Sequence, residues 1–395
     1  MLLLQGTIQR YPWGTTDAIP TLLGQPADGG PVAEYWLGAH PLAPATAGGE
    51  PLNQLIAADP SILGAGTRER FGDGLPFLMK VLSARHALSI QAHPSREQAE
   101  EGYEREQAAG VAMDAPERTY KDNWPKPEIL IALGEFHTLS GFRDPYRTES
   151  LFAALGVASD LASVIGPLTE RRGRAALEEV FLDVLSLAGD RAKMSELVCA
   201  AAMQHKDDPG EVGEFARTVI ELDEVFPADP GVLAALLMNR VVLQPGEAVY
   251  VPAGQMHAHL RGTGIEVMAN SDNVIRGGLT PKHVDVAELI KVVDFEPRDP
   301  VITRPTPVGA GVEHYETGCP EFDVWRLNGT GAAPVNLPGT GSARVLLVVS
   351  GAIEVAGSGS TTTLTAGQSA FLAADERDAT FTGEGMAFLS SSGVR

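Results

Sequence analysis

The segment from Leu88 to Pro94 alternates polar and apolar side chains in a way that could build a site for chemistry. Alternate residues of a β-strand share a face, so Ser89, Gln91 and His93 are expected to line one side of a strand here. A polar face this regular inside an apolar run is hard to explain as core, and we interpret it as part of a metal site. A solvent-exposed edge of an antiparallel sheet is the competing interpretation.

A carboxylate opens a second apolar strand, which we predict over residues 128–133. Carboxylates in such positions are usually paired with a cation or bound to a metal, so Glu128 is a candidate ligand. Lys126 lies two residues earlier, on the same face. The alternative is therefore a surface ion pair between Lys126 and Glu128, which would contribute little stability.

A turn motif leads into His257. Between Gly246 and His257 the pattern is G, five residues, P-x-G, two residues, H, and it resembles the second cupin motif. Two tight turns flank a short strand in this pattern, so that His257 begins the next strand pointing into a barrel. His259 shares that strand face and is a rival ligand.

Several separate blocks, in the right order, resemble the type I mannose-6-phosphate isomerase family. The resemblance covers most of the chain, and its most specific block is residues 266–282, EVMANSDNVIRGGLTPK. The other dense blocks are residues 11–14, 34–41, 76–94, 120–128 and 257–285. The resemblance implies a zinc-dependent aldose–ketose isomerase. Such an enzyme interconverts D-mannose 6-phosphate and D-fructose 6-phosphate through an enediol or enediolate.

The resemblance also implies a ligand set. The family holds zinc with a Gln and a His from one strand, a Glu, and a later His, and these positions carry over to Gln91, His93, Glu128 and His257. Zinc accepts imidazole nitrogen together with carboxylate or amide oxygen, and it keeps an open position for water or substrate in catalytic sites. We expect one zinc per chain.

The chain departs from the family in three places. The common pattern D-x-N-H-K-P-E has Trp124 and Pro125 here in place of its Asn and His, which excludes an acid–base role for that His. Met256 replaces a Pro that often precedes the ligand His, and His259 replaces a Tyr. Cupin spacing and the family resemblance both favour His257 over His259 as the ligand.

Aldose–ketose isomerisation moves a proton between C1 and C2, so it needs a base and positive charge near two oxygens. Zinc can supply such charge as a Lewis acid. Arg276, in the most specific block, is the first choice among cationic residues, and Lys126 is the second. Glu266 and Asp272 are the candidate acid–base groups. The sequence does not decide which group takes the proton, because its pKa depends on its surroundings.

Three residues are expected to contact the substrate. Ser89, with Lys126, is a candidate for holding the phosphate, Lys80 interrupts an apolar strand, and Trp13 could floor the pocket. A lysine in that position could instead extend its amine to solvent along the apolar surface. The remaining histidines are expected to be structural or exposed: His40, His86, His137, His205, His283 and His314.

The 395 residues predict two or three domains. We expect a mainly β fold with a helical insertion, made of cupin-like double jelly-roll barrels plus an α-helical domain. Residues 1–147 and 238–299 would form the catalytic barrel with the metal site. Residues 148–237 would form the helical domain, because apolar residues recur there at every third or fourth position. Residues 300–395 would form a second barrel without metal ligands, with separate strands at 345–349 and 352–355.

Composition excludes several classes of partner. A formal net charge of -21 would repel nucleic acid and anionic membranes, so a hexose 6-phosphate needs a locally basic site. Cys199 and Cys319 match no metal or disulfide spacing, which fits a reducing compartment. No signal segment opens the chain and no apolar run approaches the roughly 18 residues of a membrane span. We predict a cytoplasmic protein; its oligomeric state is open, and a monomer is compatible with the sequence.

Two other functions compete with the isomerase. A metal-dependent cupin oxygenase usually has an early H-x-H, but Gln91 occupies the first of those positions, and an amide suits a redox metal poorly. A non-catalytic, sugar-sensing bicupin would be supported by missing ligands, yet all four are present. The pathway stays open within carbohydrate metabolism, either toward glycolysis or toward GDP-mannose.

Overall fold

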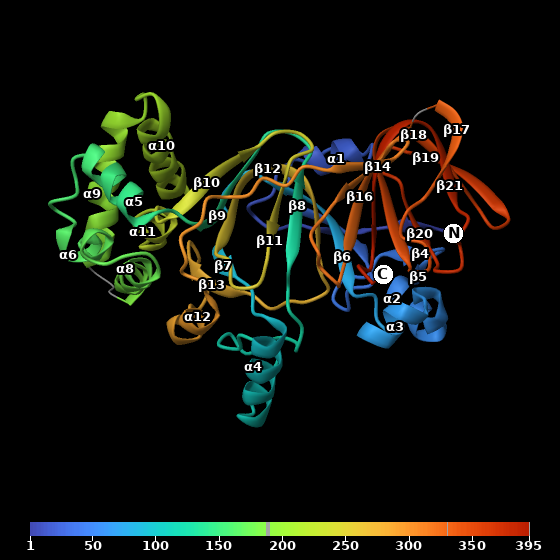
Figure 1. Cartoon of the computed structure of the whole chain (residues 1–395), viewed down its shortest axis with the longest axis horizontal. Coiled ribbons are helices and arrows are strands. Elements are labelled where there is room, and N and C mark those ends of the chain that lie inside the picture. The colour runs from blue at the N-terminus through green and yellow to red at the C-terminus, as the bar shows by residue number, and fades with distance from the viewer. Residues whose placement is uncertain (187–189, 330, 395) are drawn as a thin grey trace.

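The computed structural model describes residues 1–186, 190–329 and 331–394 of the chain. Residues 187–189 of the predicted helical domain, and residues 330 and 395 of the predicted C-terminal barrel, lie outside the described residues. Two large antiparallel β-sheets stand side by side, and a group of helices covers one end of the molecule (Figure 1). This arrangement confirms the predicted mainly β fold with helices inserted. Of the helices described, none is long and apolar enough to cross a membrane.

The first sheet is organised around one long strand, β12 (His257–Ala269). Its first half pairs with β7 (Ile90–Ala92) and β9 (Phe136–Phe142), and its second half pairs with β6 (Phe77–Ala84) and β8 (Glu128–Ala132). The register shifts between His259 and Arg261, just before the change of partners. One strand therefore contributes to two parts of the barrel wall. The remaining strands of this sheet are β2 (Thr7–Gln9), β3 (Glu34–Gly38), β10 (Met238–Leu243), β11 (Ala248–Val251) and β13 (Ile275–Gly278).

The register of these strands places polar residues in rows. Gln91 of β7 lies opposite His257 on one side and Arg276 of β13 on the other. Lys80 of β6 lies opposite Trp36 of β3 and Glu266 of β12. Directly opposite residues on neighbouring strands present their side chains on the same face. Two rows of functional side chains are thus built into the sheet.

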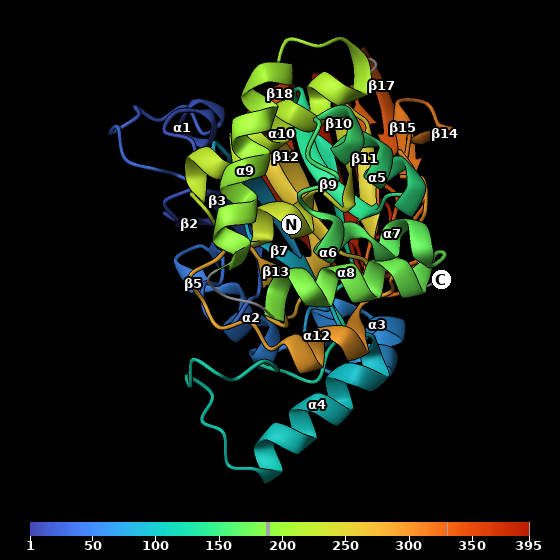
Figure 2. The same cartoon turned by 90° about the vertical axis from the view of Figure 1, so that its left-hand side faces the viewer.

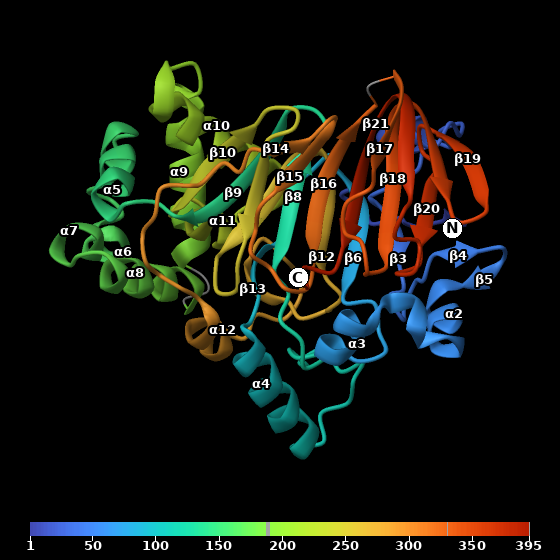
Figure 3. The same ribbon diagram turned by 45° about the vertical axis from the view of Figure 1, so that its right-hand side comes forward.

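The second sheet holds most strands of the C-terminal part, which are seen beside the first sheet in Figure 3. Its centre is β18 (Arg344–Gly357), paired with β19 (Ser360–Thr365), β20 (Ser369–Leu372) and β21 (Thr380–Ser391). The prediction of two strands over residues 345–355 is wrong, because the chain runs on through a register shift near Ser350. The outer strands on one side are β14 (Thr306–Gly309), β15 (Val312–Tyr315), β16 (Asp323–Asn328) and β17 (Gly331–Asn336).

Part of the N-terminal segment belongs to this second sheet. Strand β1 (Leu2–Gln5) pairs with β20, and β4 (Thr46–Ala47) and β5 (Glu50–Pro51) follow at the edge. This differs from the predicted assignment of all of residues 1–147 to the first barrel. An apolar strand pattern indicates that a strand forms, but not which distant strand it pairs with. The other boundaries, at residues 147, 237 and 299, stay predictions.

Helices cover the end of the first sheet (Figure 2). They run between β9 and β10, which pair with each other although residues 143–237 separate them. Phe181 of α8 packs edge-on against Phe142 of β9 and Phe295, with ring centroids 5.7 Å apart in each case. Helices and sheet therefore share one core. The helices are α5 (Pro145–Ala154), α6 (Ala162–Ile165), α7 (Pro167–Glu170), α8 (Arg174–Ser186), α9 (Asp190–His205), α10 (Gly210–Val225) and α11 (Gly231–Ala235).

A helix begins two residues after His93. Helix α4 (Arg96–Ala108) starts at Ser95, whose hydroxyl accepts a hydrogen bond from the Gln98 N–H while the Gln98 side chain accepts one from the Ser95 N–H. This capping box fixes the start of α4 just after His93, which itself directly follows β7. The other helices are α1 (Ala18–Leu22), α2 (Leu52–Ala58), η1 (Pro60–Leu63), α3 (Ala65–Phe71) and α12 (Val286–Val292).

Candidate functional site

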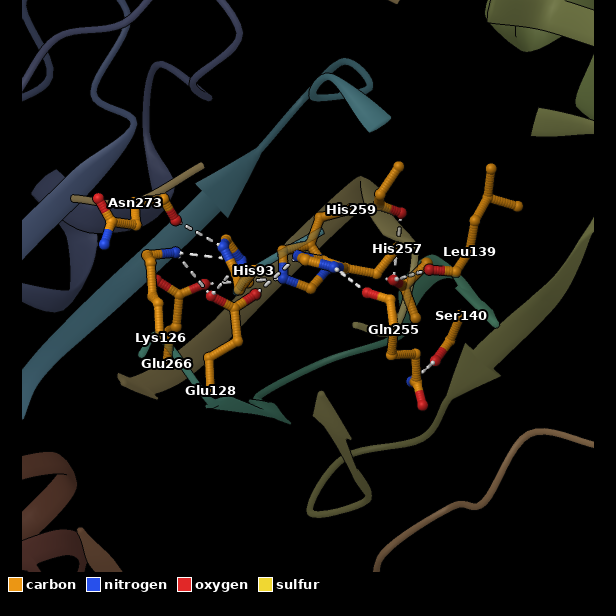
Figure 4. Close-up of polar contacts among 12 residues, drawn as sticks. His93, Lys126, Glu128, Leu139, Ser140, Gln255, His257, His259, Glu266 and Asn273 are labelled. Carbon is orange, nitrogen blue, oxygen red and sulfur yellow. Dashed lines mark hydrogen bonds and ion pairs between the residues drawn. The ribbon is translucent and has the colours of Figure 1, made fainter. Parts of the chain in front are cut away.

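Three buried residues with metal-binding side chains converge inside the first barrel. Ligand atoms of His93, Glu128 and His257 all lie within 4.8 Å of one another (Figure 4). Glu128 Oε1 lies 2.8 Å from His257 Nε2, and its Oε2 lies 3.3 Å from His93 Nε2. The three residues come from the end of β7 and the starts of β8 and β12, so the pairing of β12 with β7 and β8 brings them together.

The orientation of His93 is fixed by a hydrogen bond on the side of the ring that faces away from Glu128. Its Nδ1 lies 2.8 Å from the carbonyl oxygen of Asn273, which can only accept, so Nδ1 carries the proton and Nε2 faces Glu128 as a free lone pair. A hydrogen bond of this kind holds a metal-binding imidazole in one tautomer and orientation. Burial, and then the charge of Lys126, lowers the pKa of His93 to about 4. The ring is therefore neutral at physiological pH, which is the form that binds a metal.

His257 carries a buried nitrogen that the protein leaves without a hydrogen bond. Its Nε2 is close to Glu128, but the geometry is not that of a hydrogen bond. An unsatisfied buried nitrogen is costly, and a cation between the two imidazoles and the carboxylate would satisfy it. Two nitrogens and one carboxylate oxygen are a donor set that fits zinc.

The predicted fourth ligand, Gln91, is half-buried on β7 and lies opposite His257 in the ladder. Its side chain therefore shares the face of His257. The position agrees with the expected set, and the role of the amide as a ligand stays a prediction.

Lys126 is part of the cluster. Its Nζ lies 2.8 Å from Glu128 Oε2 and 3.3 Å from His93 Nε2, and the side chain is buried. The alternative of a surface pair between Lys126 and Glu128 is therefore wrong. Burial by itself would raise the pKa of Glu128, but Lys126 and the two histidines outweigh it and hold that pKa well below its usual range. Glu128 is an anion ready to bind a cation.

A second buried charge cluster adjoins the first. Lys80 Nζ lies 3.1 Å from Glu266 Oε2, 3.6 Å from Glu34 Oε1 and 4.9 Å from the ring centre of Trp36. Burial would lower the pKa of Lys80, but the two carboxylates outweigh it and raise that pKa. The alternative in which Lys80 reaches solvent is wrong, because only 6% of the residue is exposed. Glu34, which also accepts a hydrogen bond from Trp36 Nε1, is a member that sequence reasoning missed.

Glu266 is buried between this cluster and the metal cluster. Burial alone would raise its pKa, but Lys80, His259 and Lys126 together outweigh it, and the pKa of Glu266 falls to about 2. Its Oε1 lies 3.6 Å from Nε2 of His259, which is also buried without a hydrogen bond. His259 lies beside the His93–Glu128–His257 group rather than in it.

Asp272 lies at the more exposed side of the site. His40 Nε2 lies 3.3 Å from its Oδ1, although we predicted a structural or exposed position for His40. Burial would raise the pKa of Asp272, but the hydrogen bond and charge of His40, together with the charges of Lys80 and Lys126, outweigh it and lower that pKa. The Asp272 N–H donates to Asp122, and Asp122 also accepts from the side chain of Asn273. These bonds tie the segment before Glu128 to the carbonyl that orients His93.

Unpaired positive charge lies on the other side of Gln91. Arg276 is half-buried on β13, and within the described part of the chain no carboxylate pairs with its guanidinium. Lys282 follows on the next loop, and its pKa is lowered by burial and then by the charges of Arg276 and Lys121. A local basic patch of this kind is what an anionic substrate requires on a chain with a net charge of -21. Sequence reasoning missed Lys282, although it ends the most specific block.

The two remaining predicted contacts are less central. Ser89 is half-buried immediately before β7, and Trp13 stacks on Tyr11 with ring centroids 5.7 Å apart. Burial, followed by the charge of Glu34, raises the pKa of Tyr11, which places Tyr11 beside the Lys80 cluster. The roles of Ser89 and Trp13 stay predictions, and Tyr11 is a further candidate.

A surface hollow of about 700 Å³ lies elsewhere, between α10 and the strands β9 and β10. Two of its cations, Arg240 and Arg261, both contact Glu221. Five carboxylates line the same hollow, so it suits an anionic substrate less well than the surroundings of Arg276.

Comparison with known proteins agrees with this site. The family described as phosphomannose isomerase type I, catalytic domain, matches residues 1–145. The mannose-6-phosphate isomerase of Escherichia coli (strain K12) is 35% identical over 391 residues, or 97% of each chain. That of Rattus norvegicus is 31% identical and covers 89% of this chain and 87% of its own.

Solved structures are similar over almost the whole length. A zinc-bound mannose 6-phosphate isomerase superposes with a TM-score of 0.90 at 32% identity, covering 99% of both chains. The apo form from Salmonella typhimurium gives a TM-score of 0.91, with the same identity and coverage. With this likeness over nearly its full length, and with a buried His–Glu–His group in its first barrel, the chain belongs to the type I mannose-6-phosphate isomerase family and is an isomerase.

Proposed function

We propose that the chain is a zinc-dependent enzyme that interconverts D-mannose 6-phosphate and D-fructose 6-phosphate through an enediolate. The observation that carries this proposal is the buried His93–Glu128–His257 group, which has the unpaired Arg276 in the adjoining row of the sheet. The first gives a place for a metal beside the reacting carbons, and the second gives a place for an anion.

One zinc would be held by His93, Glu128 and His257, with Gln91 as the fourth ligand. Bound there, zinc would supply the positive charge that polarises the sugar oxygens. The protein's own part is to hold the ligands in place: Asn273 fixes the tautomer of His93, and Lys126 keeps Glu128 ionised. Lys126 is also close enough to the cluster to add positive charge to the developing enediolate.

We assign the proton transfer between C1 and C2 to Glu266. Lys80 Nζ contacts only one of its two oxygens, Oε2, and the other, Oε1, lies 3.6 Å from His259 Nε2 beside the metal cluster. The low pKa keeps this carboxylate ionised, and a negative charge developing on the sugar beside it would raise that pKa and favour proton uptake. Asp272, paired with His40, is assigned to the hydroxyl protons.

The phosphate is assigned to the basic patch. The charge of Arg276 lies close enough to Lys282 to lower the pKa of that lysine. A phosphate dianion between the two side chains would therefore be stabilised. Ser89 precedes Gln91 on the same strand face and would add a hydroxyl. The cytoplasmic location stays a prediction that agrees with two free cysteines, Cys199 and Cys319.

Turnover in deuterated water tests the function. Purified protein with mannose 6-phosphate is expected to form fructose 6-phosphate and to carry solvent deuterium into the C1 or C2 position. A chelator should abolish both, and zinc should restore them. Oxygen consumption without isomerisation would support the cupin oxygenase, and sugar phosphate binding without turnover would support the sugar-sensing bicupin.

Arg276→Ala is expected to lower kcat by about 10²- to 10³-fold, the loss typical of a preorganised donor to a developing oxyanion. If Arg276 only gathers the phosphate, KM rises while kcat stays nearly constant. Arg276→Lys should recover little of kcat, because a point charge does not reproduce the planar fork. Steady-state kinetics separates these outcomes. Arg298, an exposed arginine paired with Asp294, is the control, and near-normal constants in Arg276→Ala would remove the residue from the mechanism.

A further inference from the structure

A second group of metal-binding side chains lies beside the proposed zinc ligands. Ligand atoms of Glu128, His259 and Glu266 all lie within 4.8 Å of one another, and all three residues are buried (Figure 4). Glu128 is common to both groups. The isomerase mechanism makes no use of His259.

The orientation of His259 is set by Thr138. The Thr138 hydroxyl lies 3.1 Å from the carbonyl of Ala258 and 3.1 Å from Nδ1 of His259. Its single proton goes to a carbonyl, which can only accept, so the imidazole donates its Nδ1 proton to the hydroxyl oxygen. Nε2 is therefore the free nitrogen of the ring, and it points toward Glu266 (Figure 4).

Nothing in the described part of the protein satisfies this nitrogen. It is buried and makes no hydrogen bond, and Glu266 Oε1 is 3.6 Å away, beyond the usual range of about 2.7–3.2 Å. Two ligands that share one tetrahedral ion, each at about 2.0–2.2 Å, lie about 3.4 Å apart. The separation therefore suits two ligands of one cation better than a hydrogen-bonded pair.

We propose that His259, Glu266 and Glu128 form a second divalent-cation subsite, adjoining the first, with Glu128 shared between them. One imidazole nitrogen and two carboxylate oxygens are donors for an ion of the Zn²⁺ or Mn²⁺ type. The resembling family carries Tyr where His259 stands, so the donor set is a property of this chain. The inference rests on the proposed function insofar as Glu128 is assigned to the first zinc.

The surrounding charges make this subsite the weaker of the two. Lys80 Nζ lies 3.1 Å from Glu266 Oε2, and Lys126 Nζ lies 2.8 Å from Glu128 Oε2. Both lysines repel the ion, and although Glu266 keeps Oε1 for a metal, Glu128 would share its Oε1, which already faces His257, between the two ions. An ion in this position would bind Glu266, the residue assigned to proton transfer. Occupation is therefore inhibitory, and the enzyme would lose activity in excess zinc.

Zinc stoichiometry of the full-length protein tests the inference. Stripped protein is dialysed against buffered zinc of increasing free concentration, and bound metal is counted by mass spectrometry. The native chain is expected to bind one zinc at low free zinc and a second at higher free zinc, with activity falling as the second binds. His259→Gln and His259→Tyr should both lose the second equivalent and keep the first. His205→Gln removes a half-buried histidine that is paired with Asp208, far from the site, and should keep both.

The outcomes separate the two proposals. An active native enzyme that saturates at one zinc overturns the second subsite and leaves the isomerase intact. A second equivalent that persists in both His259 variants also overturns it, because the ion then binds elsewhere. A native chain that binds no zinc tightly and does not isomerise the sugar refutes the proposed function itself. The Tyr variant carries the residue found in the resembling family, which guards against a failure to fold.

Discussion

His257→Ala is expected to abolish tight zinc binding and to lower kcat/KM by about 10³-fold or more. Lewis-acid stabilisation is worth several kcal/mol, and each 1.4 kcal/mol or so corresponds to a factor of ten in rate. The imidazole makes few structural contacts among the described residues: Nε2 lies 2.8 Å from Glu128 Oε1 without hydrogen-bond geometry, and Nδ1 makes only a long contact of 3.3 Å to the Gln255 carbonyl. The change should therefore affect metal and rate far more than the free energy of unfolding.

A matched control lies two residues along the same strand. His259→Gln removes a buried imidazole with a similar setting, yet it should keep the tightly bound zinc. Metal analysis after dialysis, followed by kinetics with and without added zinc, compares the two variants. Retention of zinc in His257→Ala and its loss in His259→Gln would exchange the two roles and overturn the ligand assignment.

Glu266→Gln is expected to lower kcat by about 10²- to 10⁴-fold, the usual contribution of a general acid–base group, while tight zinc and KM change little. The amide keeps the shape of the side chain but has no carboxylate to take the proton. Incorporation of solvent deuterium at C1 and C2 should fall with kcat. That readout reports the proton transfer itself and does not respond to a mere loss of packing.

Glu34→Gln controls for the ion pair with Lys80. Both carboxylates compensate the same buried lysine, so both variants should destabilise the folded protein, and the free energy of unfolding in denaturant measures that shared loss. Only Glu266→Gln should lose deuterium exchange. Equal loss of exchange in the two variants would mean that Lys80, rather than Glu266, governs the proton transfer.

The candidate metal ligands could be proposed from sequence because a short-range pattern marks each of them. Strand alternation predicted Gln91 and His93 on one face. Glu128 was recognisable because a carboxylate is unusual at the start of an apolar strand. The cupin turn pattern indicated His257 in the same way. Each signal lies within a dozen residues, so the identity of the distant partner was not needed to recognise it.

The features that were missed depend on contacts between distant segments. His40 meets Asp272 across more than 200 residues of sequence, and β1 pairs with β20 near the other end of the chain. Period-two alternation fixes which face of a strand is polar, but it does not select a partner strand. The strand break that we predicted near residue 350 was wrong for a local reason, not a long-range one. The register shifts between Val348 and Ser350, and the strand then continues through Gly351, whose φ is 65°, instead of ending there.

The helices between β9 and β10 amount to a very long hairpin loop, since those two strands are direct neighbours in the sheet. Closing a loop about twenty times longer than an ordinary hairpin turn costs only about 3 kcal/mol, because the entropy of closure grows with the logarithm of length. The packing of Phe181 against Phe142 and Phe295 is of the size needed to offset such a cost. Evolution can therefore lengthen, shorten or exchange this insertion while β12 keeps its register with β7 and β8, so the size of the helical region can drift independently of the chemistry.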